Sequence, residues 1–319
     1  MHDDHLSTGL RPLVCLAGTL GSFRDAADDI LRRFTGLRLS ASSVLRATER
    51  AGETLAGRQR RQAIVRPKGM KAWDFAVEGH LPSVAYLGLD AFSVPMQLPG
   101  GAKAEHRMLY LATLYTPDKS SAVYLVDFEL GLLAAQLRQA AIAYGLAQAD
   151  QVVAITDGGN GIEEALRGHF WDDLPCILDW YHASEHLHDY AACLHPKDAQ
   201  AAAGWAEAAK GVLYERGGQA LVAYLREQGA PAEAEAAEEY RKLVNYFAAN
   251  EHRTDYPSYR AYGWDIGSGP TEAGCKVVGA RLKGSGMRWV EPGAARVAPL
   301  RALYQSGPEV WDAFWDLAL

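Results

Sequence analysis

The spacing of hydrophobic and polar residues changes twice along the chain. Over residues 22–57 the apolar positions recur at helical intervals, first in "SFRDAADDILRRF" and then in "ASSVLRATERAGETLAG". The stretch "TGLRLS" separates them, and Ser40 is a suitable N-cap for the second helix. Two helices across a tight turn resemble a helix-turn-helix with Arg46 and Arg50 on its second helix. A packed helical hairpin that touches no DNA fits the same pattern equally well.

From residue 83 the pattern becomes that of strands. "SVAYLGLDAFSV", "RMLYLATLYTP" and "SAVYLVDFEL" have strand composition and only short breaks between them, which predicts an antiparallel meander. An Ala- and Leu-rich helix follows, and then the short apolar strands in "QVVAIT" and "LPCILDW", each leading into a helix. The order βββ-α-β-α-β-α predicts an α/β fold in which the late strands pair in parallel.

Residues 196–250 interrupt this alternation. They are rich in Ala and Glu, and breaks at 217–218 and 229–231 divide them into about three helices. We interpret them as an all-helical insertion in the α/β unit. A further helix is expected at Pro270, with Glu272 in its first turn.

The organisation that follows has four parts. Residues 58–72 are rich in basic residues and contain no acid, so they serve as a boundary, either as a linker or as a contact to a phosphate backbone. We expect an N-terminal helical segment and linker (1–72), the first part of the catalytic core (73–195), the helical insertion (196–255) and the C-terminal helices of the core (256–319).

Composition restricts the class of protein. The 319 residues are 49% hydrophobic and 22% charged, as in soluble globular proteins, and no apolar run is long enough to cross a membrane. Two acids precede the first apolar run, where a secretory signal has positive charge, so we expect a cytoplasmic protein. The net charge of −7 is concentrated in residues 81–250, which argues against a uniformly basic nucleic-acid surface. The four cysteines form no C-x-x-C pair and are expected to be buried thiols.

Three carboxylates occupy positions where chemistry is usually found. Asp90 interrupts an apolar strand, Asp157 follows "QVVAIT" at the carboxyl end of a parallel strand, and Glu272 opens a late helix. Singly they could be an ion pair with an arginine, a helix N-cap and a complement to the helix dipole. As a converging set they would repel one another unless cations lay between them. Oxygen ligands favour two Mg²⁺ or Mn²⁺ ions, the arrangement used for phosphoryl transfer on nucleic acids.

Four stretches are similar to DDE transposases of bacterial insertion sequences, specifically the Kra-type group of the Mutator-like superfamily. They are "LGLDAFSV", "AITDGGNGI", "ILDWYHASEHL" and "GSGPTEAGCKVVGARLKGSGMRW". The resemblance implies an RNase H-like mixed five-stranded sheet with an inserted helical region, and Asp90, Asp157 and Glu272 as the metal-binding triad. It also implies DNA transposition by strand cleavage and strand transfer, with element ends and target DNA as partners and a homo-oligomeric enzyme.

The stretch "CILDWYHASEHLHDY" permits two interpretations. Asp179 and His182 match the D-x-x-H pair of Mutator-like transposases. Such a pair would orient DNA or support the metal ligands from a second layer of residues around them. The same residues form H-x-x-E-H with Glu185 and His186, a zinc-peptidase signature that needs a third ligand further along the chain. Glu238, Glu239 and Glu251 are available for that role. The peptidase hypothesis is the weaker one, because it leaves Asp90, Asp157 and the meander unexplained.

Basic residues follow Glu272 closely. Lys276, Arg281, Lys283 and Arg288 would suit a DNA phosphate track, or they would form a solvated helix face, and we expect Trp289 to be a core residue. Relatives commonly have a longer N-terminal region with a metal-binding DNA module, for which this sequence has no Cys/His pattern. A shortened or domesticated protein that binds DNA without cutting it is therefore the alternative to an active transposase.

Overall fold

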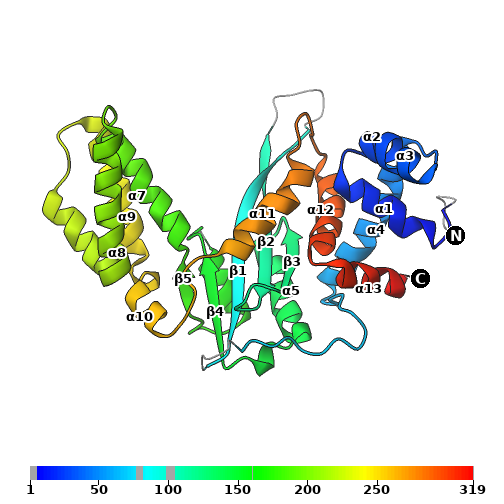
Figure 1. The fold of residues 1–319 in the computed structure, drawn as a ribbon, viewed down its shortest axis with the longest axis horizontal. Helices are drawn as coiled ribbons and strands as arrows, with labels where there is room; N and C mark the ends of the chain where they lie inside the picture. The colour runs from blue at the N-terminus through cyan, green and yellow to red at the C-terminus, as the bar shows by residue number, and fades with distance from the viewer. Residues whose placement is uncertain (1–5, 77–81, 98–104, 160, 319) are drawn as a thin grey trace.

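A mixed α/β architecture surrounds a five-stranded sheet with strand order β3-β2-β1-β4-β5 (Figure 1). The computed structural model describes residues 6–76, 82–97, 105–159 and 161–318. The strands are β1 (Val84–Pro95), β2 (His106–Tyr115), β3 (Ala122–Asp127), β4 (Gln151–Thr156) and β5 (Cys176–Leu178). β1 pairs antiparallel with β2, and β2 with β3, whereas β1–β4 and β4–β5 are parallel. The meander and the parallel late strands are thus confirmed.

Helices cover both faces of the sheet. On one face α5 (Leu130–Tyr144) and α6 (Ile162–His169) bury a core with Leu87 and Leu89 of β1. On the other face α11 (Gly269–Leu282) and α12 (Glu291–Gln305) pack against Phe92 of β1 and its neighbours. Successive β1 side chains therefore point into different cores, as the two-residue period of a strand requires. A mostly apolar run of this kind is typical of a strand that is buried on both faces.

The helical insertion lies beyond the β5 edge of the sheet, next to α7 (Trp180–Leu194) (Figure 1). It consists of α8 (Ala199–Gln228), α9 (Ala234–Ala249), the short turn η4 (Glu251–Arg253) and α10 (Tyr256–Ala261). Gly217 has a φ of 80°, which kinks α8, and Gly229 has a φ of 76° just after α8 ends. Both values are readily adopted only by glycine, so the two breaks expected from the sequence are present.

The N-terminal helices lie at the β3 side of the sheet (Figure 1). A helical segment over Phe23–Thr35 (α2, η1 and α3) precedes α4 (Ala41–Arg60), and the Ser40 hydroxyl accepts from the Ser43 N–H at 3.1 Å, so the expected N-cap is confirmed. α1 (Leu10–Leu20) was not expected. These helices share one hydrophobic core with α12 and α13 (Pro308–Ala318).

Two predictions from composition concern membrane-spanning helices and the cysteines. Within the described ranges, no helix has the length and apolar content needed to cross a lipid bilayer. Cys15, Cys176 and Cys275 are buried, as expected, whereas Cys193 is half-buried, and none of the four forms a disulfide within the described part of the chain.

Candidate functional site

The strand register brings Asp90 and Asp157 together. Tyr86 of β1 pairs with Val153 of β4, and Gly88 pairs with Ile155. Two residues further along each strand are Asp90 and Asp157, which therefore emerge on the same face of adjacent parallel strands. Neighbouring strands lie about 4.8 Å apart, so the two carboxylates interact directly.

The electrostatics of Asp90 reflect this proximity. Burial, followed by the negative charge of Asp157, raises the pKa of Asp90 to about 6. The Ala91 N–H donates to Asp90 Oδ1 at 2.6 Å, and a hydrogen bond from the Cys275 thiol also favours the charged form. No arginine forms an ion pair with Asp90 in the described part of the chain, so the simple ion-pair alternative does not account for this buried acid.

Asp157 lies in the loop that joins β4 to α6. Its Oδ1 accepts from the Gly159 N–H at 2.9 Å, and α6 has Gly161 as its N-cap residue. The alternative of Asp157 as a helix N-cap is therefore wrong. Gly158, between them, has a φ of 85°, a conformation that a residue with a Cβ adopts only with strain.

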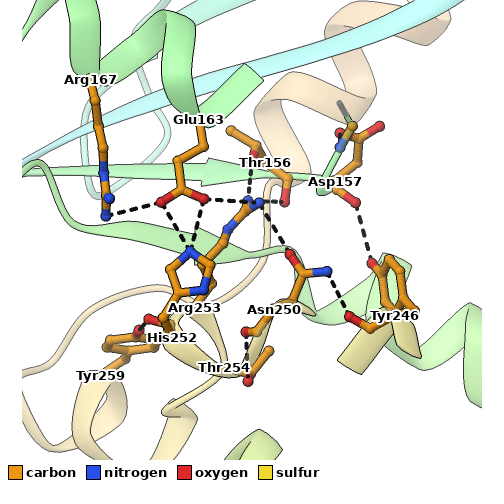
Figure 2. Close-up of polar contacts among 11 residues, drawn as sticks. Thr156, Asp157, Glu163, Arg167, Tyr246, Asn250, His252, Arg253, Thr254 and Tyr259 are labelled. Carbon is orange, nitrogen blue, oxygen red and sulfur yellow. Dashed lines mark hydrogen bonds and ion pairs between the residues drawn. The ribbon is translucent and has the colours of Figure 1, made fainter. Parts of the chain in front are cut away.

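The helical insertion contacts the end of β4 (Figure 2). Arg253, only 3% exposed, donates from Nη2 to the Thr156 hydroxyl and, at 3.5 Å, to the Thr156 carbonyl oxygen. The Tyr246 hydroxyl donates to the Asp157 carbonyl oxygen at 3.4 Å. The sequence analysis missed both residues, because 97 positions separate Arg253 from Thr156 and 89 separate Tyr246 from Asp157. Neither follows a local pattern.

Glu272 lies on the helix that crosses β1. An added Cβ at Gly88 would overlap the Thr271 hydroxyl, so α11 approaches the strand as closely as a glycine allows. Cys275, one helical turn after Glu272, reaches Asp90. The half-exposed Glu272 carboxylate is bound to Lys276 Nζ at 2.6 Å.

Asp90, Asp157 and Glu272 therefore do not form a complete set of metal ligands in the described structure. Over the described residues, the structure contains no group of three His, Cys, Asp or Glu side chains that could hold a metal ion. Asp90 and Asp157 fit such an ion, since both present oxygen atoms on one face, and burial followed by the negative charge of Asp157 raises the pKa of Asp90. Glu272 would have to exchange Lys276 for the metal.

Asp179 joins the starts of two helices. It is 5% exposed, and its Oδ1 caps α7 by accepting from the N–H groups of Tyr181 (2.7 Å) and His182 (3.4 Å). Its Oδ2 accepts from the Ser268 N–H at 2.9 Å and from the Ser268 hydroxyl, just before α11. Burial raises the pKa of Asp179. In this position Asp179 fixes the first turn of α11, the turn that holds Glu272.

The H-x-x-E-H residues form a partly exposed group on α7. The rings of His182 and His186 meet edge to face, with centroids 4.8 Å apart, and His182 Nδ1 lies 3.7 Å from Glu185. Burial, followed by the charge of His182, lowers the pKa of His186. Among the described side chains no third ligand joins the two histidines, which leaves the zinc site without structural support.

The basic residues divide into two kinds. Lys276, Lys283 and Arg288 are exposed, as are Arg46 and Arg50 on α4. Arg281 is 3% exposed and donates from Nε to the Gly18 carbonyl oxygen at 2.9 Å. Its place in a surface DNA track was a wrong expectation, because it joins α11 to α1 instead. Trp289 is 7% exposed and donates to the Leu282 carbonyl, as expected of a core residue.

Comparison with known proteins adds no assignment. No protein-family model matches this chain, and a search of curated proteins gives no significant match. The geometry of the site must therefore support any functional conclusion.

Proposed function

We propose that this protein is a DDE-type transposase with an RNase H-like core, which cuts and joins DNA strands. The observation that supports this most directly is the placement of Asp90 on the central strand β1 and of Asp157 at the end of its parallel neighbour β4. Asp157 follows the carboxyl end of β4, where α/β sheets place ligands, and Asp90 lies beside it on β1. Such an enzyme would act on DNA in the cytoplasm as a homo-oligomer.

Asp90 and Asp157 would hold two Mg²⁺ or Mn²⁺ ions together with Glu272, once Glu272 leaves Lys276. When bound, such ions stabilise the attacking and leaving oxygens of a phosphodiester. Lys276 would then be free to contact a DNA phosphate near Lys283, which lies two turns further along the α11 region. Asp179 would keep the first turn of α11 in place through Ser268.

A nicking assay on supercoiled plasmid with Mg²⁺ or Mn²⁺ tests the proposal without knowledge of the element ends. A 3′-OH oligonucleotide added to the same plasmid tests strand transfer. We expect Asp90→Asn, Asp157→Asn and Glu272→Gln each to abolish both reactions, and the exposed-acid control Glu164→Gln to retain them. A variant of the three that cuts at the wild-type rate would remove that residue from the site.

DNA binding without cleavage is the second candidate. It is favoured by the Glu272–Lys276 ion pair, because among the described residues Glu272 pairs with Lys276 and does not join Asp90 and Asp157 in a group of three ligands. A protein of this kind would shift the plasmid in a gel and leave it intact at every Mn²⁺ concentration, with or without the Lys276→Met substitution that releases Glu272.

A further inference from the structure

We infer that Arg253 is a positioning residue for Asp157, so that the helical insertion sets the geometry of the carboxylate loop in the core. The inference rests on the proposed function only in naming Asp157 as a metal ligand. Arg253 lies in η4, directly after α9, and reaches back to the last residue of β4 (Figure 2). Its side chain is almost completely buried.

The contacts of Arg253 fix the backbone just before Asp157. Nη2 donates to both the hydroxyl and the carbonyl oxygen of Thr156. The same Thr156 carbonyl accepts from the Asp179 N–H at 2.8 Å, so the strand end is held from two sides. Nη1 donates to Asn250 Oδ1 at 3.4 Å, which ties the guanidinium to the end of α9. A planar group with several donors suits this task, and a lysine would not satisfy these acceptors together.

The charge of Arg253 is compensated locally. Glu163 of α6 lies 3.6 Å from Nη1, and its carboxylate also contacts His252 at 3.0 Å and Arg167 at 3.0 Å. Burial of an unpaired guanidinium would be strongly unfavourable, so these partners are needed. The pairing connects η4 to the helix that begins immediately after the Asp157 loop, and so both ends of that loop are attached to Arg253.

Tyr246 contributes a second, independent contact. Its hydroxyl donates to the carbonyl oxygen of Asp157 itself, while its ring packs against His186 and Phe247. Between these contacts lies Gly158, whose backbone has more conformational freedom than that of a residue with a Cβ. The direction in which the Asp157 carboxylate leaves the sheet therefore depends on donors from the insertion.

The test uses the full chain and two measurements. Amide exchange of Gly159, whose N–H is bound to Asp157 Oδ1, reports the position of the loop without any metal. The Mn²⁺ concentration for half-maximal plasmid nicking reports the consequence. The variants are Arg253→Met, Arg253→Lys and Tyr246→Phe. The control is Arg260→Met, which removes a guanidinium that stacks on Tyr214 at 3.6 Å within the insertion.

We expect Arg253→Met to speed amide exchange of Gly159 about tenfold. It should also raise the Mn²⁺ concentration for half-maximal nicking about 10- to 100-fold, the range observed when a residue that orients a metal ligand is lost. Arg253→Lys should be intermediate, Tyr246→Phe should act in the same direction, and Arg260→Met should change neither quantity. Where Arg253→Met does not fold, Arg253→Lys and Tyr246→Phe decide the matter.

The possible failures can be told apart. Wild-type values of both quantities in the Arg253 and Tyr246 variants would overturn the positioning role and leave the metal site intact. If the wild-type protein neither binds Mn²⁺ nor nicks DNA, and Gly159 exchange still rises in these variants, the proposed function fails and the positioning of Asp157 stands.

Discussion

Replacing Asp90 by Asn should make the protein more stable while it removes the proposed DNA-nicking activity. In the folded chain Asp90 lies beside Asp157, and burial together with that charge raises its pKa from 3.8 to about 6. An asparagine at this position keeps an oxygen for the Ala91 N–H and gains an N–H group that can donate to Asp157. The substitution therefore removes a repulsion and need not break a hydrogen bond.

The pKa shift sets the size of the effect. A shift of about 2 units corresponds to about 3 kcal/mol, at 1.36 kcal/mol per unit. Because the folded pKa lies above the unfolded one, the folded state holds the proton more tightly, and the associated stability is present below pH ~4 and lost as the pH rises through about 6. At pH 7 the free energy of unfolding of Asp90→Asn should therefore exceed that of the wild type by up to about 3 kcal/mol, whereas at pH 4 the two should be almost equal.

Urea unfolding at pH 4 and pH 7 measures this difference directly, with Glu164→Gln as a control expected to lie within about 0.5 kcal/mol of the wild type. Mg²⁺ should raise the melting temperature of the wild type and not that of Asp90→Asn, because a ligand stabilises only the state that binds it. An Asp90→Asn protein that is less stable than the wild type at pH 7, with the same gap at pH 4, would refute the electrostatic reasoning.

Two further predictions concern the helix that holds Glu272. Gly88→Ala should lower the free energy of unfolding by about 1–3 kcal/mol, because its methyl group would displace the Thr271 hydroxyl and with it α11. Gly211→Ala in the open part of α8 should raise the free energy of unfolding by about 0.5–1 kcal/mol. Equal melting temperatures for the two variants would argue against the close contact between Gly88 and Thr271. Asp179→Ala should lower the free energy of unfolding in urea by about 2–4 kcal/mol, because α7 loses its cap and the Ser268 N–H and hydroxyl lose their partner. An Asp179→Ala protein whose free energy of unfolding lies within about 0.5 kcal/mol of the wild type would show that α7 and α11 do not depend on Asp179.

The sequence was sufficient for the features that depend on local pattern. The strand composition around Asp90, the apolar "QVVAIT" before Asp157 and the proline before Glu272 predicted the elements on which these acids lie. The pairing register then made Asp90 and Asp157 neighbours, as the parallel arrangement implied.

The remaining features depend on contacts between distant parts of the chain. Arg253 meets Thr156 only because the insertion folds back over β5, and Arg281 is buried because α1 covers it. The Glu272–Lys276 pair is local, at i,i+4 spacing, but a sequence does not show whether a surface carboxylate prefers a lysine or a metal. Whether Glu272 binds Lys276 or a metal ion thus could not be predicted from the sequence.

The shared core of the first and last helices has a consequence for biosynthesis. Leu55 of α4 and Phe314 of α13 are both fully buried in it, and Arg58 donates to the Leu317 carbonyl oxygen at 2.8 Å. During translation the opening helices leave the ribosome well before α12 and α13 exist to cover them. Their apolar faces therefore stay uncovered until α12 and α13 have been synthesised, so this core can form only after the sheet and the helical insertion have been made.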